Sequence, residues 1–197
     1  VADKKPIVMG DLLTTCSVKH WENPALHRYK GRICFRGDCA KDEHGKAAAY
    51  QDLGASPAGI FSINSNIAYG CCPGNTTTAS DAITAYLQAL LLALIATWVA
   101  IPIALWPADG SWHRKGVKNQ GDDRPMCRLY KALYGHPEAG GHWERLLNKS
   151  MKELGAIPVS SHKSSFWFLK QFQLLTVYVD DLLLSGPAEL QAEVWKN

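Results

Sequence analysis

Asp180 and Asp181 are adjacent in the chain and lie between two apolar runs. Apolar, β-rich runs that close on a short polar step are typical of a β-hairpin, so we expect the two acids at a turn between buried strands. Two like charges held this close repel each other unless a cation neutralises them. Mg²⁺ is commonly bound by one or two carboxylates together with substrate phosphates. A bare Asp-Asp pair is more often a turn without a ligand, which is our interpretation of Asp122 and Asp123 in a polar loop.

Several blocks of sequence around Asp180 and Asp181 favour the metal-binding interpretation. Tyr-Val-Asp-Asp at 178–181 runs directly into Leu-Leu-Leu-Ser-Gly. Upstream lie Met-Cys-Arg-Leu-Tyr-Lys-Ala-Leu-Tyr-Gly at 126–135, Asp-Ala-Ile-Thr-Ala-Tyr at 81–86 and Tyr-Lys-Gly-Arg-Ile-Cys-Phe-Arg-Gly at 29–37. Taken in this order, the blocks resemble reverse transcriptases, and most closely the copia-type retrotransposon branch. The resemblance covers about residues 29 to 187.

The resemblance implies an α+β fold: a reverse-transcriptase-like palm with partial fingers, in which an antiparallel sheet packs on helices. Residues 1–80 would be the partial fingers, and residues 81–197 a truncated palm without thumb or RNase H region. The implied function is that of an RNA-directed DNA polymerase fragment, with an RNA template, a DNA primer and dNTPs as partners. The implied location is intracellular, either cytoplasmic or nuclear.

The resemblance also implies a catalytic triad of Asp81, Asp180 and Asp181. Joining a primer hydroxyl to the α-phosphate of a nucleotide uses two Mg²⁺ ions about 3.5–4 Å apart, which requires carboxylates that converge from distant parts of the sequence. We therefore expect the three carboxylates to lie within about 10 Å of one another. Taken alone, Asp81 beside Ser80 is more often a helix N-cap, and the two roles are compatible.

Five further residues are predicted to contact the nucleotide. In the resembled family an aromatic residue at the position of Tyr86 blocks the 2′-hydroxyl of a ribonucleotide and so selects dNTPs; a core tyrosine is the alternative. Lys30, Arg32 and Arg36 recur at even spacing along an expected strand, which allows them to face one way and contact a triphosphate. A solvated strand face is the simpler explanation. Glu138 stands where the family has a nucleotide-contacting Gln.

Three departures from the family pattern argue that the chain is weakly active or inactive alone. A carboxylate at Glu138 is unfavourable near a triphosphate unless a metal or an arginine compensates its charge. Gly141 replaces a family arginine, and Ile83 replaces a family lysine. Whether the chain is an enzyme is therefore left open at this point.

Residues 82–107 contain no charged side chain, and 87–106 is about as long as a membrane span. The family resemblance predicts a palm helix over 87–94 followed by a strand over 97–101. The alternative is a mostly helical fold with one membrane-spanning helix at about 82–106. In that case the chain would be a membrane-embedded, retroelement-derived, non-catalytic subunit that meets its partners through 87–106.

Composition sets few limits on function. The 197 residues are 47% hydrophobic, which is ordinary for a globular chain, and the net charge of +3 is compatible with nucleic acid without being diagnostic. The six cysteines form no CxxC pair, and Cys34, Cys39 and His44 lack the fourth ligand of a structural zinc site. Beyond the blocks above, we expect helices over 57–70 and 137–155, a turn-rich link over 70–80 and a surface loop over 108–125.

Overall fold

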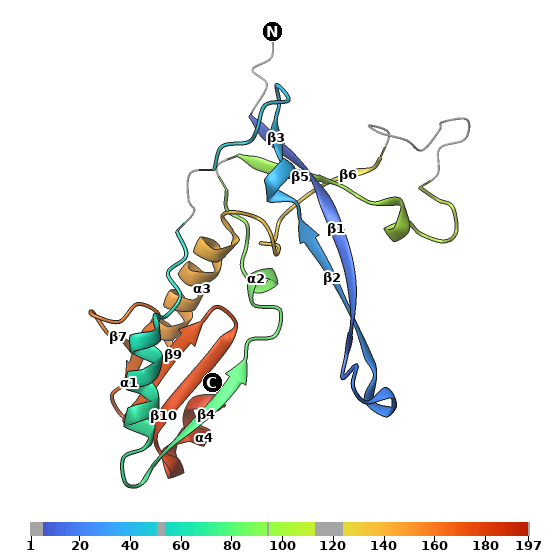
Figure 1. Ribbon diagram of the computed structural model, residues 1–197. Coiled ribbons are helices and arrows are strands. Elements are labelled where there is room, and N and C mark those ends of the chain that lie inside the picture. Colours follow the sequence, from blue (N-terminus) through green and yellow to red (C-terminus); the bar gives the residue numbers. More distant parts are fainter. Residues whose placement is uncertain (1–5, 51–53, 94, 113–123, 197) are drawn as a thin grey trace. The chain divides into compact units, whose positions relative to one another are not determined.

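The computed structural model describes residues 6–50, 54–93, 95–112 and 124–196. Helices and strands are mixed, and the strands form two five-stranded sheets in the described residues, which confirms the α+β class (Figure 1). The chain divides into two compact units, each made of two separate stretches. Unit 1 contains residues 1–51 and 90–139, and unit 2 contains residues 52–89 and 140–197. The predicted boundary between fingers and palm at residue 80 stays a prediction.

Unit 2 is built around an antiparallel sheet in the order β4-β10-β9-β8-β7. Its strands are β4 (Asn75–Asp81), β7 (Ile157–Pro158), β8 (Ser165–Phe168), β9 (Gln173–Tyr178) and β10 (Asp181–Pro187). Its helices are α1 (Ile60–Gly70), α2 (Ala85–Gln88), α3 (Ala139–Glu153) and α4 (Gln191–Trp195), with a 3-10 turn at Ala188–Leu190. The β9–β10 hairpin predicted from the apolar runs is therefore present, and its central strands are buried.

The two faces of this sheet differ in chemistry because successive strand residues point to opposite sides. On one face Leu175, Val177 and Leu184 pack with Trp143 and Leu147 of α3 in the main hydrophobic core. The other face is polar and lies under α1. There the side-chain amide of Asn66, which is fully buried, donates to the Leu174 carbonyl and the Thr176 hydroxyl at 2.9 Å.

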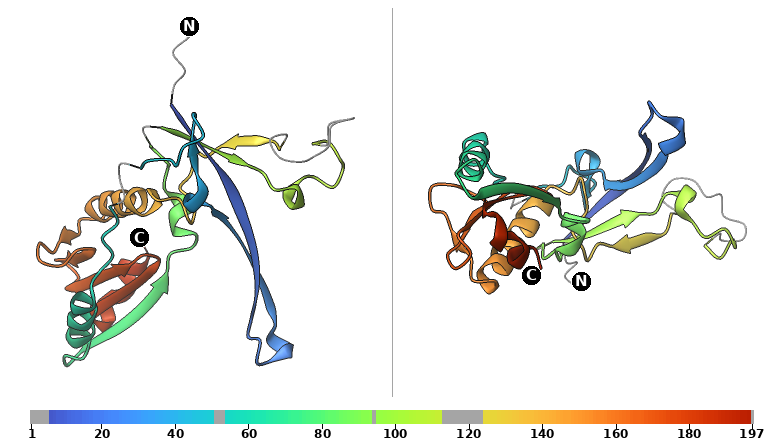
Figure 2. Two further views of the ribbon diagram at one scale, coloured as in Figure 1. Left: turned by 45° about the horizontal axis from the view of Figure 1, so that its top comes forward. Right: turned by 90° about the horizontal axis from the view of Figure 1, so that it is seen from below.

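Unit 1 is a second sheet, in the order β2-β1-β5-β6, with β3 attached to β1. Its strands are β1 (Ile7–Lys19), β2 (Arg28–Phe35), β3 (Lys41–Asp42), β5 (Ala96–Ala100) and β6 (Met126–Arg128). Short 3-10 turns lie at Pro24–Leu26, Gly37–Cys39 and Ile103–Leu105. The first half of β1 pairs with β5 in parallel, and the second half pairs only with β2. The distal part of the β1–β2 hairpin is thus a two-stranded ribbon that extends beyond the other elements of its unit (Figures 1 and 2).

The first half of the apolar run 82–106 adopts neither of the two conformations that were predicted for it. The alternative of one continuous helix is wrong, because α2 ends at Gln88, the strand β5 follows at Ala96–Ala100, and only a 3-10 turn comes after it among the described residues of the run. The predicted helix over 87–94 is also wrong beyond Gln88, where α2 ends; residue 94 lies outside the described residues. The chain leaves α2 at Gln88, and Leu90 and Leu91 pair instead with residues 130 and 131. The predicted strand is confirmed one residue earlier, as β5.

Across the described ranges, every helix is too short or too polar to cross a membrane.

One other prediction was wrong. The segment 70–80 was expected to be a link, but Asn75–Asp81 forms β4 at the sheet edge. Three consecutive threonines at 76–78 favour a strand once β10 is available as a partner. The helices predicted over 57–70 and 137–155 are confirmed as α1 and α3, and Gly155 after α3 has the left-handed φ of +79° that helix ends favour.

Candidate metal centre

Asp81, Asp180 and Asp181 converge in unit 2. The register of the sheet sets Asp181 of β10 directly opposite Asp81 of β4. In the β9–β10 hairpin Asp181 pairs with Tyr178, so Val179 and Asp180 form a two-residue turn beside them. One carboxylate oxygen from each residue lies within 4.8 Å of the other two. The structure therefore brings together the three residues that the sequence analysis selected from two separate blocks.

The donor set of this cluster fits a divalent cation. Its three carboxylates offer only oxygen ligands, which suit Mg²⁺ or Mn²⁺ rather than softer metals. Asp81 and Asp181 are exposed and Asp180 is half-buried, so water and a substrate phosphate have room to complete a coordination sphere. Three carboxylates at this distance repel one another, and a bound cation would relieve that repulsion.

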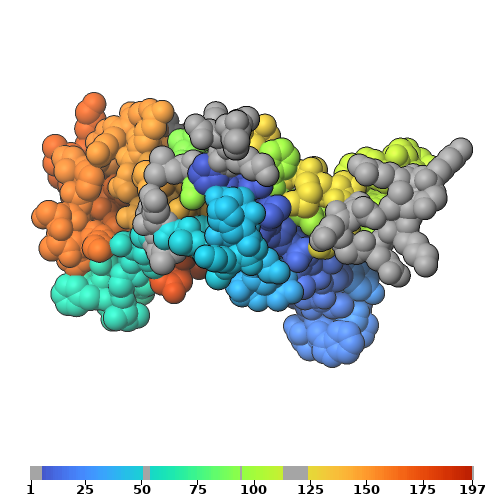
Figure 3. Space-filling view, turned by 90° about the horizontal axis from the view of Figure 1, so that it is seen from above, coloured from blue at the N-terminus to red at the C-terminus, as the bar shows by residue number. Residues whose placement is uncertain are grey.

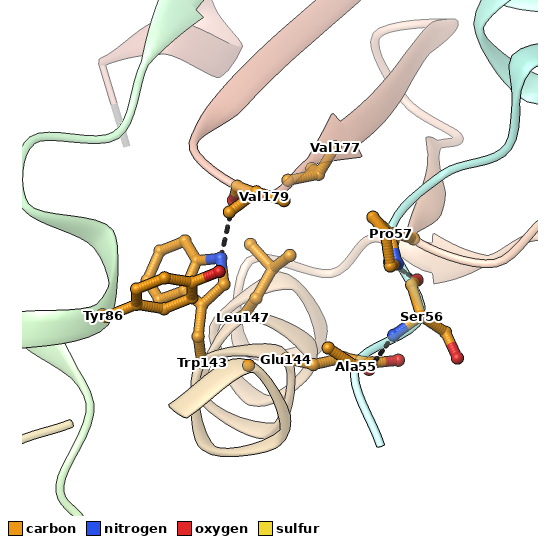
Figure 4. A pocket seen from close by; sticks show the side chains of 11 residues that line it. Ala55, Ser56, Pro57, Tyr86, Trp143, Glu144, Leu147, Val177 and Val179 are labelled. Carbon is orange, nitrogen blue, oxygen red and sulfur yellow. Dashed lines mark hydrogen bonds between the residues drawn. The ribbon is translucent and has the colours of Figure 1, made fainter. Parts of the chain in front are cut away.

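The backbone of the turn is held in an unusual conformation. Val179 has a φ of +58°, in the left-handed region that a β-branched residue rarely adopts. Such a conformation costs on the order of 1–3 kcal/mol and persists only where the surroundings impose it. Two hydrogen bonds do so here. The Trp143 indole N–H donates to the Val179 carbonyl at 2.7 Å (Figure 4). The Ala82 amide donates to the Asp180 carbonyl at 2.7 Å.

An apolar pocket lies behind the turn, within unit 2 (Figure 4). Tyr86 of α2 lines it together with Trp143, Leu147, Val177 and Val179. Tyr86 is half-buried and packs against the main core of the unit. Its predicted role at the nucleotide and its alternative as a core tyrosine both fit this placement.

The predicted triphosphate contacts Lys30, Arg32 and Arg36 lie in unit 1. Lys30 and Arg32 are on β2, opposite Ser17 and Thr15 of β1, so they share one face of the ribbon. Arg36 follows the strand, and its guanidinium forms an ion pair with Asp38 at 2.9 Å. A hydrogen bond and the charge of Asp38 raise the pKa of Arg36, and the pKa of Asp38 is lowered in return by its hydrogen bond to Arg36.

Glu138 lies in the interior of unit 1, with 8% of its surface exposed. It lines a small pocket with Val8, Tyr50 and Thr97, among other residues. Its backbone amide donates to Nδ1 of His136 at 3.2 Å. The sequence analysis missed this buried position, because the local sequence around Glu138 resembles an exposed helix start.

Sequence reasoning also missed two cations and one tryptophan. Arg28 is two residues before Lys30, so its even spacing could have predicted that it shares their face of the ribbon. Lys19 lies on the other strand, and only its pairing with Arg28 places it on that face. Trp143 was assigned to an apolar helix face, and nothing local predicts its bond to the turn. Among the described residues the aspartate triad is the one cluster of metal-ligand type, so Cys34, Cys39 and His44 form no such group.

No family model, curated protein or solved structure matches this chain.

Proposed function

We propose that the chain is a metal-dependent nucleotidyl transferase of the reverse-transcriptase type, an RNA-directed DNA polymerase fragment. The observation that carries this proposal is the convergence of Asp81 with Asp180 and Asp181. The three were selected from sequence blocks about a hundred residues apart, and they meet within 4.8 Å where β4 pairs with the β9–β10 hairpin. A turn at Asp180 and Asp181 without a ligand, or a helix N-cap at Asp81, would not require the three carboxylates to lie close together.

In this proposal the carboxylates of Asp81, Asp180 and Asp181 hold two Mg²⁺ ions. The ions, when bound, activate the attacking 3′-oxygen and stabilise the leaving oxygen. The chain's own residues fix the geometry: β4 and β10 bring Asp81 and Asp181 face to face, and the turn presents Asp180 beside them. Tyr86 would limit the space for a ribose 2′-hydroxyl.

The ribbon of unit 1 supports a nucleic-acid partner. Lys19, Arg28, Lys30 and Arg32 share one of its faces, which we call the cationic face. In the described part of the chain none of the four is in a salt bridge. Residues two apart on a strand are about 6.8 Å apart, which is about twice the 3.4 Å axial spacing of phosphates on one DNA strand. The tip of the hairpin protrudes from its unit (Figure 3). Lys19, Arg28 and Arg32 are exposed, so a polyanion can reach this face.

The test is extension of an oligo-dT primer on poly-rA with Mg²⁺, by the full chain and by Asp181→Asn. We expect slight extension that Asp181→Asn abolishes, because Glu138, Gly141 and Ile83 replace residues of the resembled family. Asp109→Asn is a matched control, since Asp109 lies in an exposed turn of unit 1 with Ser111. Extension that survives Asp181→Asn would contradict the proposal.

A second candidate is a non-catalytic, retroelement-derived subunit of a larger complex. The observation that favours it is a set of large apolar side chains exposed on unit 2: Ile60 and Phe61 at 72% each and Ile83 at 79%. Such side chains are typical of surfaces that another protein covers. Absence of both Mn²⁺ binding and primer extension in the folded chain would favour this candidate.

A further inference from the structure

We infer that Trp143 is a positioning residue for the metal centre: its indole N–H holds the peptide between Val179 and Asp180 in the one orientation that keeps Asp180 in the triad. This inference rests on the proposed function, because it assigns a role in the same site. The proposed role of Trp143 depends on its bond to the Val179 carbonyl and not on a contact with a carboxylate. It acts through the backbone of the turn.

The hydrogen bond from Trp143 is short, and the tryptophan that donates it is buried. Its donor and acceptor atoms are 2.7 Å apart, and 8% of Trp143 is exposed. The indole is fixed by its place on α3, where Leu147 follows one turn later and both side chains belong to the main core. The donor therefore belongs to the main core of unit 2, and the acceptor belongs to a β-branched residue with positive φ.

The turn requires this bond because of the residue that occupies it. Two-residue hairpin turns place a residue with positive φ first, and glycine, asparagine or aspartate is the usual choice. Val179 fills that position here with a φ of +58°. A valine released from its surroundings returns to negative φ, and this change would rotate the adjoining peptide.

Asp180 stands between two restrained carbonyls. Trp143 holds the carbonyl before it, and the Ala82 amide holds the carbonyl of Asp180 itself. Asp181 and Asp81 are further fixed by ladder pairing, which Asp180 lacks because it is in the turn. Loss of the indole N–H should therefore displace Asp180 and leave the Asp81–Asp181 pair in place.

The experiment compares Mn²⁺ affinity, measured by titration with detection of free Mn²⁺ by electron paramagnetic resonance, in the wild type and Trp143→Phe. We expect Trp143→Phe to bind Mn²⁺ 10–100-fold more weakly, the usual loss for a residue that orients a metal ligand. Trp195→Phe is the matched control. Its indole N–H bonds Thr78 of β4 at 2.9 Å, away from the turn, and its loss should leave the affinity unchanged.

A purely structural role for Trp143 predicts different results for two more variants. Leu147→Ala damages the same core without removing the N–H, and we expect a lower melting temperature with unchanged Mn²⁺ affinity. Val179→Gly in the Trp143→Phe background removes the tendency of residue 179 to leave positive φ, and we expect it to restore most of the affinity. Equal losses in Leu147→Ala and Trp143→Phe, or no rescue by glycine, would overturn the inference.

Two further measurements keep the inference separate from the proposed function. If the wild type binds no Mn²⁺, the proposed centre fails, and the inference is then decided by the intraresidue amide–Hα NOE of residue 179, which is strong at positive φ. We expect that NOE to weaken in Trp143→Phe and to persist in Trp195→Phe. Persistence in both variants would refute the positioning role of Trp143. If Trp143→Phe does not fold, β-(3-benzothienyl)alanine at position 143 keeps the ring shape without the N–H, and the same outcomes apply.

Discussion

The hydroxyl of Tyr50 is buried in unit 1 and has no hydrogen-bond partner among the described residues. Its ring packs edge-on against His136, and it lines the small pocket that Glu138 also lines. Burial raises the pKa of Tyr50 to about 12, and the negative charge of Glu138 adds to the shift.

We expect unit 1 to lose stability between pH 10 and pH 12 in part because of Tyr50. The folded pKa of about 12 lies above the ordinary value of 10.0, so the folded state binds the proton more tightly in this interval. Stability from this source is complete below pH 10 and falls as the pH rises toward 12. Denaturant unfolding followed at several pH values, in the wild type and Tyr50→Phe, measures the difference.

The same variant has a clear expectation at pH 7. Replacing a buried hydroxyl that has no partner by hydrogen costs little, so Tyr50→Phe should change the free energy of unfolding by less than about 1 kcal/mol. A large loss of stability would show that the hydroxyl has a partner in solution, such as a water in the pocket.

At the scale of elements, most residues of the two-stranded ribbon of unit 1 are exposed. An isolated two-stranded ribbon is marginally stable in water, so a partner that covers one face would stabilise it. The cationic face carries Lys19, Arg28, Lys30 and Arg32 without a paired carboxylate in the described residues, whereas Arg36 is paired with Asp38. That contrast provides an internal comparison for binding experiments.

We expect Lys30→Gln/Arg32→Gln to weaken binding of a single-stranded oligonucleotide and to make that binding less dependent on salt. Each lost phosphate contact should reduce the slope of log affinity against log salt by about 0.7 on a single strand. Fluorescence anisotropy in EDTA at several salt concentrations measures this without any metal. Arg36→Gln is the control and should have a smaller effect, and equal effects of the two changes would remove the cationic face as a binding site.

The helix α1 depends on one buried amide. Asn66 is fully buried, and its side-chain nitrogen also lies 3.1 Å from the Leu183 carbonyl, so α1 is tied to both β9 and β10. Asn66→Ala should cost about 1–3 kcal/mol of unfolding free energy, because it removes the hydrogen bonds that the buried amide nitrogen donates. Asn64→Ala on the same helix is the control, since Asn64 is exposed, and thermal unfolding followed by circular dichroism compares them.

Elements with strong local patterns were predictable from the sequence. The β9–β10 hairpin follows from apolar runs around two acids, and α3 follows from Pro137, its apolar spacing and Gly155. Elements that depend on distant partners were not. The strand β4 exists because β10 pairs with it, and the Leu-rich segment after Gln88 has a good helical composition but extends to pair with residues 130 and 131.

The candidate site divides in the same way. The sequence motifs identified Asp81, Asp180 and Asp181 as candidate metal ligands. The approach of Asp81 to Asp181 depends on the register between β4 and β10, which the sequence alone does not determine. The strain at Val179 and the bond from Trp143 depend on a helix docking on the hairpin, 36 residues away in sequence. Burial of Glu138 likewise depends on packing within unit 1.

At the scale of the whole molecule, the chain contains two hydrophobic cores. One joins Leu184, Val177 and Phe166 with α3 in unit 2, and the other joins Val8, Phe35 and Val99 in unit 1. The chain passes between the units three times, at residues 51–52, 89–90 and 139–140. Each unit has its own buried apolar contacts, which is the physical requirement for opening as a separate cooperative segment.

We therefore expect Leu184→Ala to destabilise unit 2 selectively. Leu184 is fully buried in the core of that unit, and truncation of such a leucine costs about 2–5 kcal/mol through lost burial and the cavity left behind. Native-state hydrogen exchange should show faster exchange in β8, β9 and β10, with β1 and β5 little changed. Leu87→Ala is the control, because Leu87 is 38% exposed in the same unit and its truncation should have little effect. Equal acceleration in both sheets would contradict this expectation and show that the two cores unfold together as one cooperative segment.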